Sequence, residues 1–232
     1  MKIIVVGGSR GIGLQVVITA LDAGHEVTIF SRRPDVAGLK NPKVSYVSGS
    51  VLDEKSLSSA IKGHDVVICA LGLSSRQAIG PPLSGRSKVL SRGTQNIIAA
   101  MHTDHVRRLL CVTAIATGDS KKQCTWLARV GLTLGLRWLF IEKNHQELLI
   151  QKSGLDWTIF RPTALTNGHH HGELAPQNRR FGMLSHISRA DVARAMIDSI
   201  HDGRSYKKAL ILSYEPRFGD SVRWLAGYFE VT

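Results

Sequence analysis

The sequence has little that would mark a secreted or membrane-bound protein. It holds only three cysteines among 232 residues, without Cys-x-x-Cys spacing, so we expect neither a disulfide framework nor a zinc site. No segment approaches the ~18 uncharged apolar residues that a membrane helix requires, and we expect no membrane partner. The apolar start at residues 2–6 is too short for a signal peptide, which favours a cytoplasmic protein.

Acidic residues are also scarce. The chain has 18 Asp and Glu against 30 Lys and Arg, a formal net charge of +12 that suits an anionic ligand or a nucleic acid. No long run of Lys and Arg and no aromatic RNA-binding motif accompanies this charge, so we expect no nucleic-acid partner. A hydrophobic fraction of 43% with 21% charged residues is typical of a globular domain with a full core.

Strands and helices alternate along the chain. Apolar runs rich in β-branched residues predict strands at residues 2–7, 26–31, 43–48, 65–71, 108–113, 157–161 and 208–213. Helical periodicity lies between most of them, at residues 12–23, 54–62, 88–102, 141–153 and 189–201. This alternation predicts an α/β fold with a doubly wound parallel sheet, as in the Rossmann fold. We expect one domain over residues 1–232, in which a small C-terminal extension, 163–232, contributes the substrate side.

Two longer segments do not fit the repeat of strands and helices. They cover residues 73–87 and 163–185, and both follow predicted strands. Ligands in open α/β folds bind beyond the carboxyl ends of the strands, so we expect these segments to choose the substrate. The second contains His169, His170 and His171, but adjacent histidines on a loop lack a fixed coordination geometry, and we predict no metal site there.

A glycine-rich stretch, VVGGSRGIG at residues 5–13, joins the first predicted strand to the first predicted helix. Gly7, Gly11 and Gly13 permit a tight turn, a close approach of backbone N–H groups to a phosphate, and close packing of the helix. The N-terminus of the helix adds positive potential. At the first strand-to-helix junction of such a chain, this pattern predicts a dinucleotide-binding loop.

The end of the second predicted strand indicates which dinucleotide binds. NAD-binding units usually have an acidic residue there, which accepts a hydrogen bond from the ribose 2′-hydroxyl. This sequence has Ser31, followed by Arg32 and Arg33. Guanidinium groups suit a 2′-phosphate, which a carboxylate would repel, and Arg10 in the glycine loop can reach the same phosphate. We therefore predict NADP(H) as the cofactor.

Five stretches together resemble the short-chain dehydrogenase/reductase superfamily, and within it the atypical NmrA-like branch that includes flavin reductase/biliverdin-IXβ reductase. They are GGSRGIG (7–13), HDVVICALG (64–72), SRGTQNIIAAM (91–101), RRLLCVTAIATG (107–118) and EKNHQELLIQKSGLDWTIFRPTAL (142–165). The branch usually has G-x-x-G-x-x-G, and here Arg10 takes the place of the middle glycine. Gly11 restores the spacing of ordinary short-chain dehydrogenases, in which a basic residue before this glycine accompanies a preference for NADP.

The resemblance implies where the cofactor is bound. Residues after the third strand usually hold the adenine, often through an Asp, but Ser50 stands there, so the contact passes to backbone near Val51. Lys143 matches the superfamily lysine that binds the nicotinamide ribose. The full implied cofactor-binding set is Gly7, Ser9, Arg10, Gly11, Ile12, Gly13, Ser31, Arg32, Arg33, Ser50, Val51, Ala70, Leu71, Gly72, Thr113, Ala114, Lys143, Pro162, Thr163 and Ala164.

Two further charged residues lie near this set. Glu147 follows Lys143 by four residues and so falls on the same helical face. Arg161 precedes Pro162 at the end of the sixth predicted strand. We expect Arg161 to pair with a buried acid or with backbone and so to hold the following loop, a role of position rather than chemistry.

The residues that usually donate the proton are missing. Superfamily members have a tyrosine four residues before the lysine and a serine on the fifth strand, and this sequence has Leu139 and Ala114 at those places. Without a general acid, alcohol and carbonyl chemistry loses a factor of about 10² to 10⁴ in rate. Thr113 and His145 are candidate substitutes, although a Thr hydroxyl would polarise an acceptor rather than protonate it. We assign the catalytic roles to Lys143 and Thr113.

Two hypotheses of different classes remain. The first is an NADPH-dependent oxidoreductase that transfers hydride to a planar, conjugated small molecule such as a flavin, quinone or tetrapyrrole, where solvent can supply the proton. The second is a non-catalytic NADP(H)-binding redox sensor or regulatory protein, which the missing tyrosine favours. We expect the enzyme, as a monomer or a weak homo-oligomer.

Overall fold

The computed structural model of the chain describes residues 1–72, 88–168, 173–182 and 185–214, apart from the side chains of residues 36 and 126–137. The whole predicted segment 73–87 and the three adjacent histidines, His169 to His171, lie outside these ranges. The expectations attached to them therefore stay predictions.

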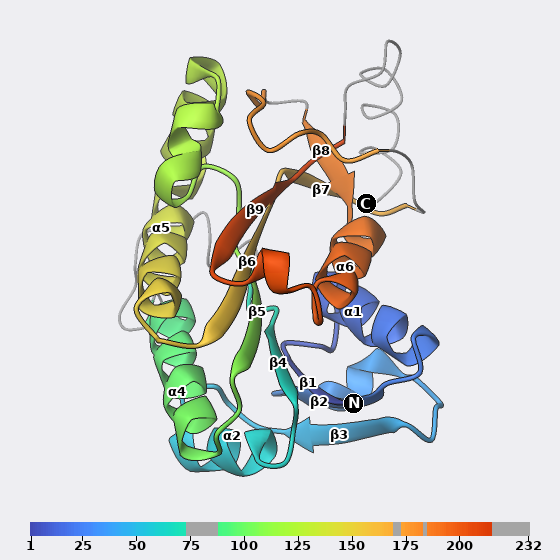
Figure 1. The fold of residues 1–232 in the computed structure, drawn as a ribbon. Helices are drawn as coiled ribbons and strands as arrows, with labels where there is room; N and C mark the ends of the chain where they lie inside the picture. Colours follow the sequence, from blue (N-terminus) through green and yellow to red (C-terminus); the bar gives the residue numbers. More distant parts are fainter. Residues whose placement is uncertain (73–87, 169–172, 183–184, 215–232) are drawn as a thin grey trace.

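In the described part of the chain, seven parallel strands form one sheet at the centre of the molecule, in the order β3-β2-β1-β4-β5-β6-β9 (Figure 1). Within β1, Ile3 and Val5 enter one buried core, and Ile4 and Val6 enter the core on the opposite face. A strand that is buried on both faces reads as a continuous apolar run, which is the signal that predicts it. The strands are β1 (Lys2–Val6), β2 (Glu26–Ser31), β3 (Val44–Ser48), β4 (Val66–Cys69), β5 (Arg108–Val112), β6 (Asp156–Pro162) and β9 (Lys208–Leu212).

Helices cover both faces of this sheet. On one face α1 (Gly11–Asp22) packs against α6 (Arg189–Asp198). On the other face α2 (Glu54–Ile61), α4 (Val89–Thr103) and α5 (Trp126–Gln151) follow one another (Figure 1). The predicted α/β class with a doubly wound parallel sheet is therefore confirmed. Short 3₁₀ segments are η1 (Pro34–Ala37), η3 (Gly118–Gln123) and η4 (Gly203–Ser205).

The start of one helix differs from the prediction. α5 begins at Trp126, whereas the sequence pattern predicts a start at residue 141. The prediction missed the first half of the helix because Gly131 and Gly135 lower its helix propensity. α6 begins where its capping residue predicts, since Ser188 Oγ accepts a hydrogen bond from Asp191 N at 3.0 Å. Helix boundaries are thus readable where capping chemistry marks them.

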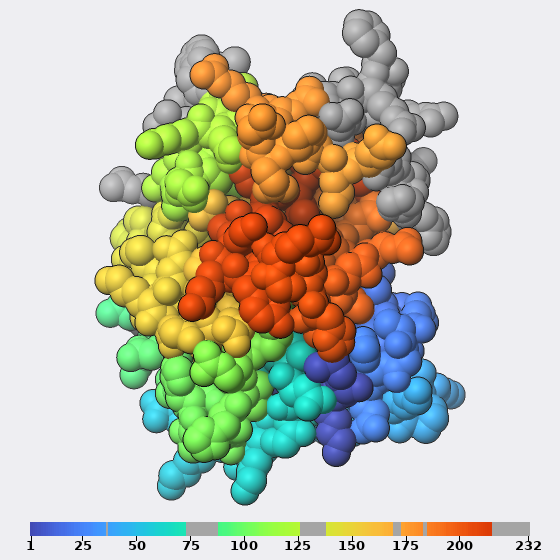
Figure 2. Space-filling view, in the orientation of Figure 1, coloured from blue at the N-terminus to red at the C-terminus, as the bar shows by residue number. Residues whose placement is uncertain are grey.

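The segment after β6 forms a second, small sheet beside the carboxyl end of the central one. β7 (Ala164–Thr166) pairs in parallel with β8 (His186–Ser188). Between them, Gln177 binds the edge strand β9 with its side chain, because Nε2 donates to Ile211 O and Oε1 accepts from Ile211 N, both at 2.8 Å. In Figure 2 this orange segment covers the upper part of the molecule, above the red β9. The described part of residues 163–185 is therefore fastened to the sheet edge.

All three cysteines are reduced and buried. Cys69 on β4 lies opposite Cys111 on β5. A hydrogen bond with Cys111 lowers the pKa of Cys69 to about 7, whereas burial raises the pKa of Cys111. Within the described ranges, no helix is long and apolar enough to cross a bilayer. The same part of the chain contains no group of three or more His, Cys, Asp and Glu residues placed to hold a metal ion.

Candidate functional site

The predicted site residues gather at one edge of the central sheet. All seven strands are parallel, so their carboxyl ends meet at the same edge. The chain turns in opposite directions on either side of the β1–β4 neighbour pair, since β2 and β3 lie to one side of β1 and β5, β6 and β9 lie beyond β4. Such a switch point leaves a crevice in which open α/β folds bind their ligands.

The glycine loop after β1 forms a tight cradle there. A Cβ atom on Gly13 would lie only 2.2 Å from Gly7 O, so no other residue allows α1 to approach the loop this closely. Arg10 occupies the N-cap of α1 in an extended conformation, makes no capping hydrogen bond, and is followed by no acidic residue in the first turn. The first N–H groups of an uncapped helix are available to a ligand, and they favour an anion. The loop therefore fits the pyrophosphate of a dinucleotide.

The end of β2 adds a polar atom in need of a partner. Ser31 Oγ is buried and has no hydrogen-bond partner among the residues that the structure describes. A buried hydroxyl without a partner costs about 1–3 kcal/mol, which a bound ligand can offset. Arg32 and Arg33 follow it with exposed side chains, and Arg10 is also exposed. This donor set, without a carboxylate, fits a phosphorylated ribose.

The backbone after β3 and β4 forms the next part of the crevice. Val51 O accepts a hydrogen bond from Asn96 Nδ2 at 3.0 Å, so α4 holds the loop of Ser50 and Val51 in place. A Cβ on Gly93 of α4 would meet Val51 Cγ2 at 2.8 Å, so the two segments are in close contact. After β4, Ala70 and Leu71 are half-buried and Gly72 is exposed.

Lys143 is buried beneath the ends of β4 and β5. Its ammonium donates to Leu71 O at 3.0 Å, to Val112 O at 2.9 Å and to Gln146 Oε1 at 3.1 Å. An ammonium group has three N–H donors, so this arrangement uses all of them. Burial lowers the pKa of Lys143. In this geometry Lys143 ties two strands and α5 together, and its predicted contact with the nicotinamide ribose stays a prediction.

Thr113 belongs to a buried network around Glu147. Its Oγ1 donates to Glu147 Oε1 at 2.6 Å, and Thr117 Oγ1 donates to the same oxygen at 2.5 Å. Arg161 adds two further hydrogen bonds to this carboxylate, from Nε at 3.0 Å and from the terminal nitrogen NH2 at 2.7 Å. Arg161 and Glu147 are each 2% exposed. The expected pairing of Arg161 with a buried acid is confirmed, and that acid is Glu147.

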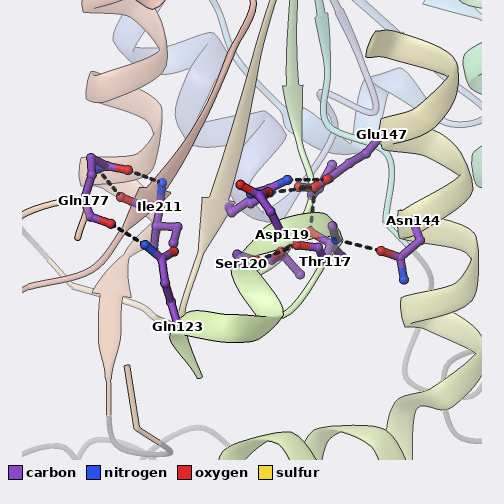
Figure 3. Close-up of polar contacts among 12 residues, drawn as sticks. Thr117, Asp119, Ser120, Gln123, Asn144, Glu147, Gln177 and Ile211 are labelled. Atoms are coloured by element: carbon purple, nitrogen blue, oxygen red, sulfur yellow. Dashed lines mark hydrogen bonds and ion pairs between the residues drawn. The ribbon is translucent and has the colours of Figure 1, made fainter. Parts of the chain in front are cut away.

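The same network fixes the loop between β5 and α5 (Figure 3). Arg161 NH1 binds Asp119 Oδ1 at 2.6 Å, and Gly118 N donates to Asn144 Oδ1 at 2.8 Å. Gly118 lies directly against the ion pair, since a Cβ there would stand 2.6 Å from Arg161 NH2. Ala116 adopts a left-handed φ of 66°, which is strained for a residue other than glycine. Strain of this kind persists where the surrounding contacts determine the conformation, as they do here.

No signal in the sequence predicts the part that Asp119 plays in this network. It lies in a 3₁₀ segment without periodicity, and its side chain is 85% exposed although its partner is buried. Burial raises the pKa of Asp119, but the hydrogen bond and positive charge of Arg161 outweigh this and hold it below its usual value.

The remaining predicted residues take less specific places. Ala114 and Leu139 are half-buried, and neither can donate a proton. His145 has a side chain that is 60% exposed. The stretch Pro162 to Ala164 joins β6 to β7, where Pro162 O accepts from Ile115 N at 3.0 Å and so holds the loop after β5. Hydrogen bonds thus hold the loop after β5 in place, and its expected position beside the nicotinamide stays a prediction.

Comparison with known proteins agrees with the cofactor that this crevice fits. Residues 7–203 match the family described as NAD(P)H-binding. The chain is 26% identical to UPF0659 protein YMR090W of Saccharomyces cerevisiae over 223 residues, which cover 91% of the chain and 92% of that protein. It is 38% identical to bifunctional pinoresinol-lariciresinol reductase 2 of Linum usitatissimum over 80 residues, or 30% of the chain, and spans 24% of that reductase.

The fold also matches solved structures. ChuY, an anaerobilin reductase from Escherichia coli O157:H7, superposes with a TM-score of 0.74 at 21% identity, covering 94% of this chain and 98% of that one. Because the two sequences are only 21% identical, this similarity shows a shared fold and nothing more. The family match covers most of the chain and includes the glycine loop, Lys143 and the Glu147–Arg161 pair. The chain therefore belongs to the NAD(P)H-binding family of Rossmann-fold proteins.

Proposed function

We propose that the chain is an NADPH-dependent reductase that transfers hydride to a planar, conjugated acceptor such as a flavin, quinone or tetrapyrrole. When bound, the cofactor supplies the hydride, and the protein holds the two reacting rings together and excludes water. The observation that carries the proposal is the fixed loop at Thr113 to Asp119. Hydrogen bonds of Thr117, Gly118 and Asp119 hold this loop and its strained residue Ala116 in one conformation. The loop lies at the carboxyl edge of the sheet, where we expect the nicotinamide and acceptor rings to be aligned.

The choice of NADPH over NADH rests on the first half of the crevice. Arg32 and Arg33 follow β2 with exposed side chains, Arg10 is exposed at the start of α1, and the buried Ser31 hydroxyl has no partner within the described ranges. These groups suit a 2′-phosphate, and among them stands no carboxylate to accept from a 2′-hydroxyl or repel a phosphate.

The choice of acceptor rests on the second half. Ala114 and Leu139 cannot donate a proton, the Thr113 hydroxyl donates to Glu147, and the donors of Lys143 are all in use. A ketone or aldehyde needs a proton at its oxygen as hydride arrives. A delocalised acceptor spreads the new charge and can take its proton from solvent. The site therefore favours conjugated acceptors over simple carbonyl compounds.

The same engagement of Thr113 and Lys143 favours a second candidate function, a non-catalytic NADP(H) sensor. A protein that only reports the reduced or oxidised state of the nucleotide needs the cradle and the arginines, but no donor beside the nicotinamide.

Turnover distinguishes the two functions. We would follow NADPH oxidation with FMN, a naphthoquinone and biliverdin as acceptors, and with a simple aldehyde and a ketone as controls. The reductase predicts turnover with at least one conjugated acceptor, none with the carbonyl controls, and a preference for NADPH over NADH. Tight binding of NADPH without turnover on any acceptor would refute the reductase and favour the sensor.

A further inference from the structure

Two buried thiols lie in contact near the carboxyl edge of the sheet. Cys69 is the last residue of β4, and Cys111 lies directly opposite it on β5, the neighbouring parallel strand (Figure 1). Both side chains enter the same hydrophobic core, so they lie on the same face of the sheet. Burial, and then a hydrogen bond to Cys69, raise the pKa of Cys111, so the Cys111 thiol is the donor of that bond. The fold therefore holds two sulfur atoms within reach of each other.

The surroundings of Cys69 favour its thiolate. The hydrogen bond from Cys111 lowers the pKa of Cys69 to about 7, although burial acts in the opposite direction. The positive charge of Lys143 also lowers this pKa, and Gln146 Nε2 donates a hydrogen bond to Cys69 Sγ at 3.6 Å. The thiolate is the nucleophilic form of cysteine, and a nearby ammonium group stabilises it. Cys69 is therefore the more reactive sulfur of the pair.

The spacing of the two strands permits a bond between the sulfur atoms. Neighbouring strands lie about 4.8 Å apart, within the range of about 4.4–6.8 Å that separates the Cα atoms of a disulfide. Side chains on adjacent parallel strands project in the same direction, whereas a relaxed disulfide needs Cβ atoms only about 3.8 Å apart. A disulfide at this place draws the two strand ends together and carries strain. Strained disulfides are readily reduced again, as a reversible modification requires.

The same two strand ends hold Lys143. Its ammonium donates to Leu71 O at 3.0 Å, two residues after Cys69, and to Val112 O at 2.9 Å, one residue after Cys111. Drawing the strand ends together therefore changes the distances between a buried ammonium and its acceptors.

The end of β4 also touches the glycine loop. A Cβ atom on Gly7 would lie only 2.8 Å from Ala70 O, so the loop is in close contact with the residue that follows Cys69. Ala70 N donates to Val6 O at 2.9 Å, directly before the loop. A displacement of Cys69 is thus passed within one residue to the cradle that fits the pyrophosphate.

From this geometry we propose that Cys69 and Cys111 form a reversible disulfide, with hydrogen peroxide as the oxidant, and that this disulfide weakens the binding of NADPH. The Cys69 thiolate attacks one peroxide oxygen, the O–O bond breaks and hydroxide leaves, which gives a sulfenic acid on Cys69. The sulfur of Cys111 then attacks the sulfur of Cys69. The S–S bond forms as the S–O bond breaks, and the proton of Cys111 leaves with the hydroxide as water. Two thiols and one peroxide give one disulfide and two waters.

Burial determines which thiol reacts with the sulfenic acid. Cys69 is 1% exposed and Cys111 is fully buried, whereas the chain after β4 reaches the surface at Gly72. We expect the small peroxide molecule to enter by local opening of this strand end, which glutathione is too large to follow. The sulfenic acid therefore meets Cys111 before any thiol from solution.

Mass analysis of the wild-type protein tests the bond directly. The reduced protein is treated with hydrogen peroxide and desalted, and the remaining thiols are labelled after unfolding. We expect a loss of mass equal to two hydrogen atoms, a pair of peptides linked through Cys69 and Cys111, and a label on Cys124 alone. A sulfinic acid on Cys69 without a linked pair, or a link through Cys124, would overturn the proposal.

Fluorescence titration with NADPH tests the consequence of the bond. We expect the desalted, oxidised protein to bind NADPH with a Kd raised about tenfold, and treatment with dithiothreitol to restore the original Kd. An unchanged Kd in the linked protein would overturn the proposal. Neither measurement depends on turnover, so failure of the proposed reductase would leave both results as they are.

Two variants locate the effect on binding. Cys69→Ala lacks the nucleophile and should keep its NADPH affinity after treatment with peroxide. Cys124→Ala is the matched control, since Cys124 is also buried but packs in a different hydrophobic cluster, and it should lose affinity as the wild type does. A loss of affinity in peroxide-treated Cys69→Ala would place the oxidation elsewhere and refute the role of the pair.

Discussion

Replacing Glu147 by glutamine should destabilise the fold, because it removes one charge of a buried ion pair. The Glu147 carboxylate accepts four hydrogen bonds, two of them from Arg161 within an ion pair whose side chains are each 2% exposed. Breaking a buried ion pair by removing one charge costs about 3–5 kcal/mol, because the other charge stays buried. Asp119 still neutralises part of Arg161, so we expect a loss of about 3 kcal/mol in the free energy of unfolding.

Urea unfolding followed by circular dichroism and tryptophan fluorescence measures this loss. With a slope of about 2 kcal/mol per molar urea, a loss of about 3 kcal/mol lowers the midpoint by about 1.5 M. Glu142→Gln is the matched control, since Glu142 is a buried carboxylate on the same helix that accepts from Ser91 N and Oγ and pairs with no arginine whose side chain the structure describes. We expect it to cost about 1 kcal/mol. Equal midpoints for the two variants would refute the reasoning.

A double variant separates the effect of the unpaired Arg161 charge on stability from the effect of the packing of the Arg161 side chain. Glu147→Leu leaves Arg161 buried with Asp119 as its remaining ionic partner, and adding Arg161→Met removes the isolated charge as well. Replacement of a buried pair by apolar residues is often close to neutral, so the double variant should be more stable than Glu147→Leu by at least about 1 kcal/mol. If the second change destabilises further, the contribution of Arg161 is packing rather than charge.

Three further predictions concern the cofactor site and the loop after β5. Arg32→Ala should lower the preference for NADPH over NADH by about tenfold to a hundredfold, as fluorescence titration of both nucleotides would show, and an unchanged ratio would place the phosphate elsewhere. Gly13→Ala puts a methyl group 2.2 Å from Gly7 O and should abolish NADPH binding, whereas Gly203→Ala, which meets nothing within 4 Å, should bind normally. Asp119→Asn should remove a pH-dependent part of the stability. Burial raises the pKa of Asp119, but the hydrogen bond and charge of Arg161 outweigh burial and hold this pKa below 3.8 in the folded state. This contribution is fully present above about pH 5 and disappears as the pH falls through the folded pKa, so wild type and variant should converge in acid; a constant difference from about pH 7 to pH 3 would contradict it.

The sequence predicts the sheet and the glycine cradle because each depends on residue type. Continuous apolar runs such as Ile3 to Val6 require burial on both faces, and a position like Gly13 tolerates no Cβ. The sequence also predicts that Arg161 has a buried acid or backbone as its partner, since a guanidinium at the end of a buried strand needs a counter-charge or hydrogen-bond acceptors.

The contacts of Lys143 could not be predicted in this way. Its acceptors are the main-chain oxygens of Leu71 and Val112, and a carbonyl group carries no mark of residue type. Likewise, Gln177 gives no sign in the sequence that its amide will reach Ile211 on the edge strand. Such contacts follow from where the folded backbone places its polar groups, which no local pattern records.

The bond between Gln177 and Ile211 has a consequence for how copies of the chain meet. Among the described residues β9 is the last strand of the sheet, and an edge strand with unpaired N–H and C=O groups is a template for another strand. At Ile211 both groups are already taken by a side chain that imitates a neighbouring strand. A second chain that added itself here would have to displace an intramolecular partner rather than water, so the fold protects this point of its edge against growth into a continuous intermolecular sheet.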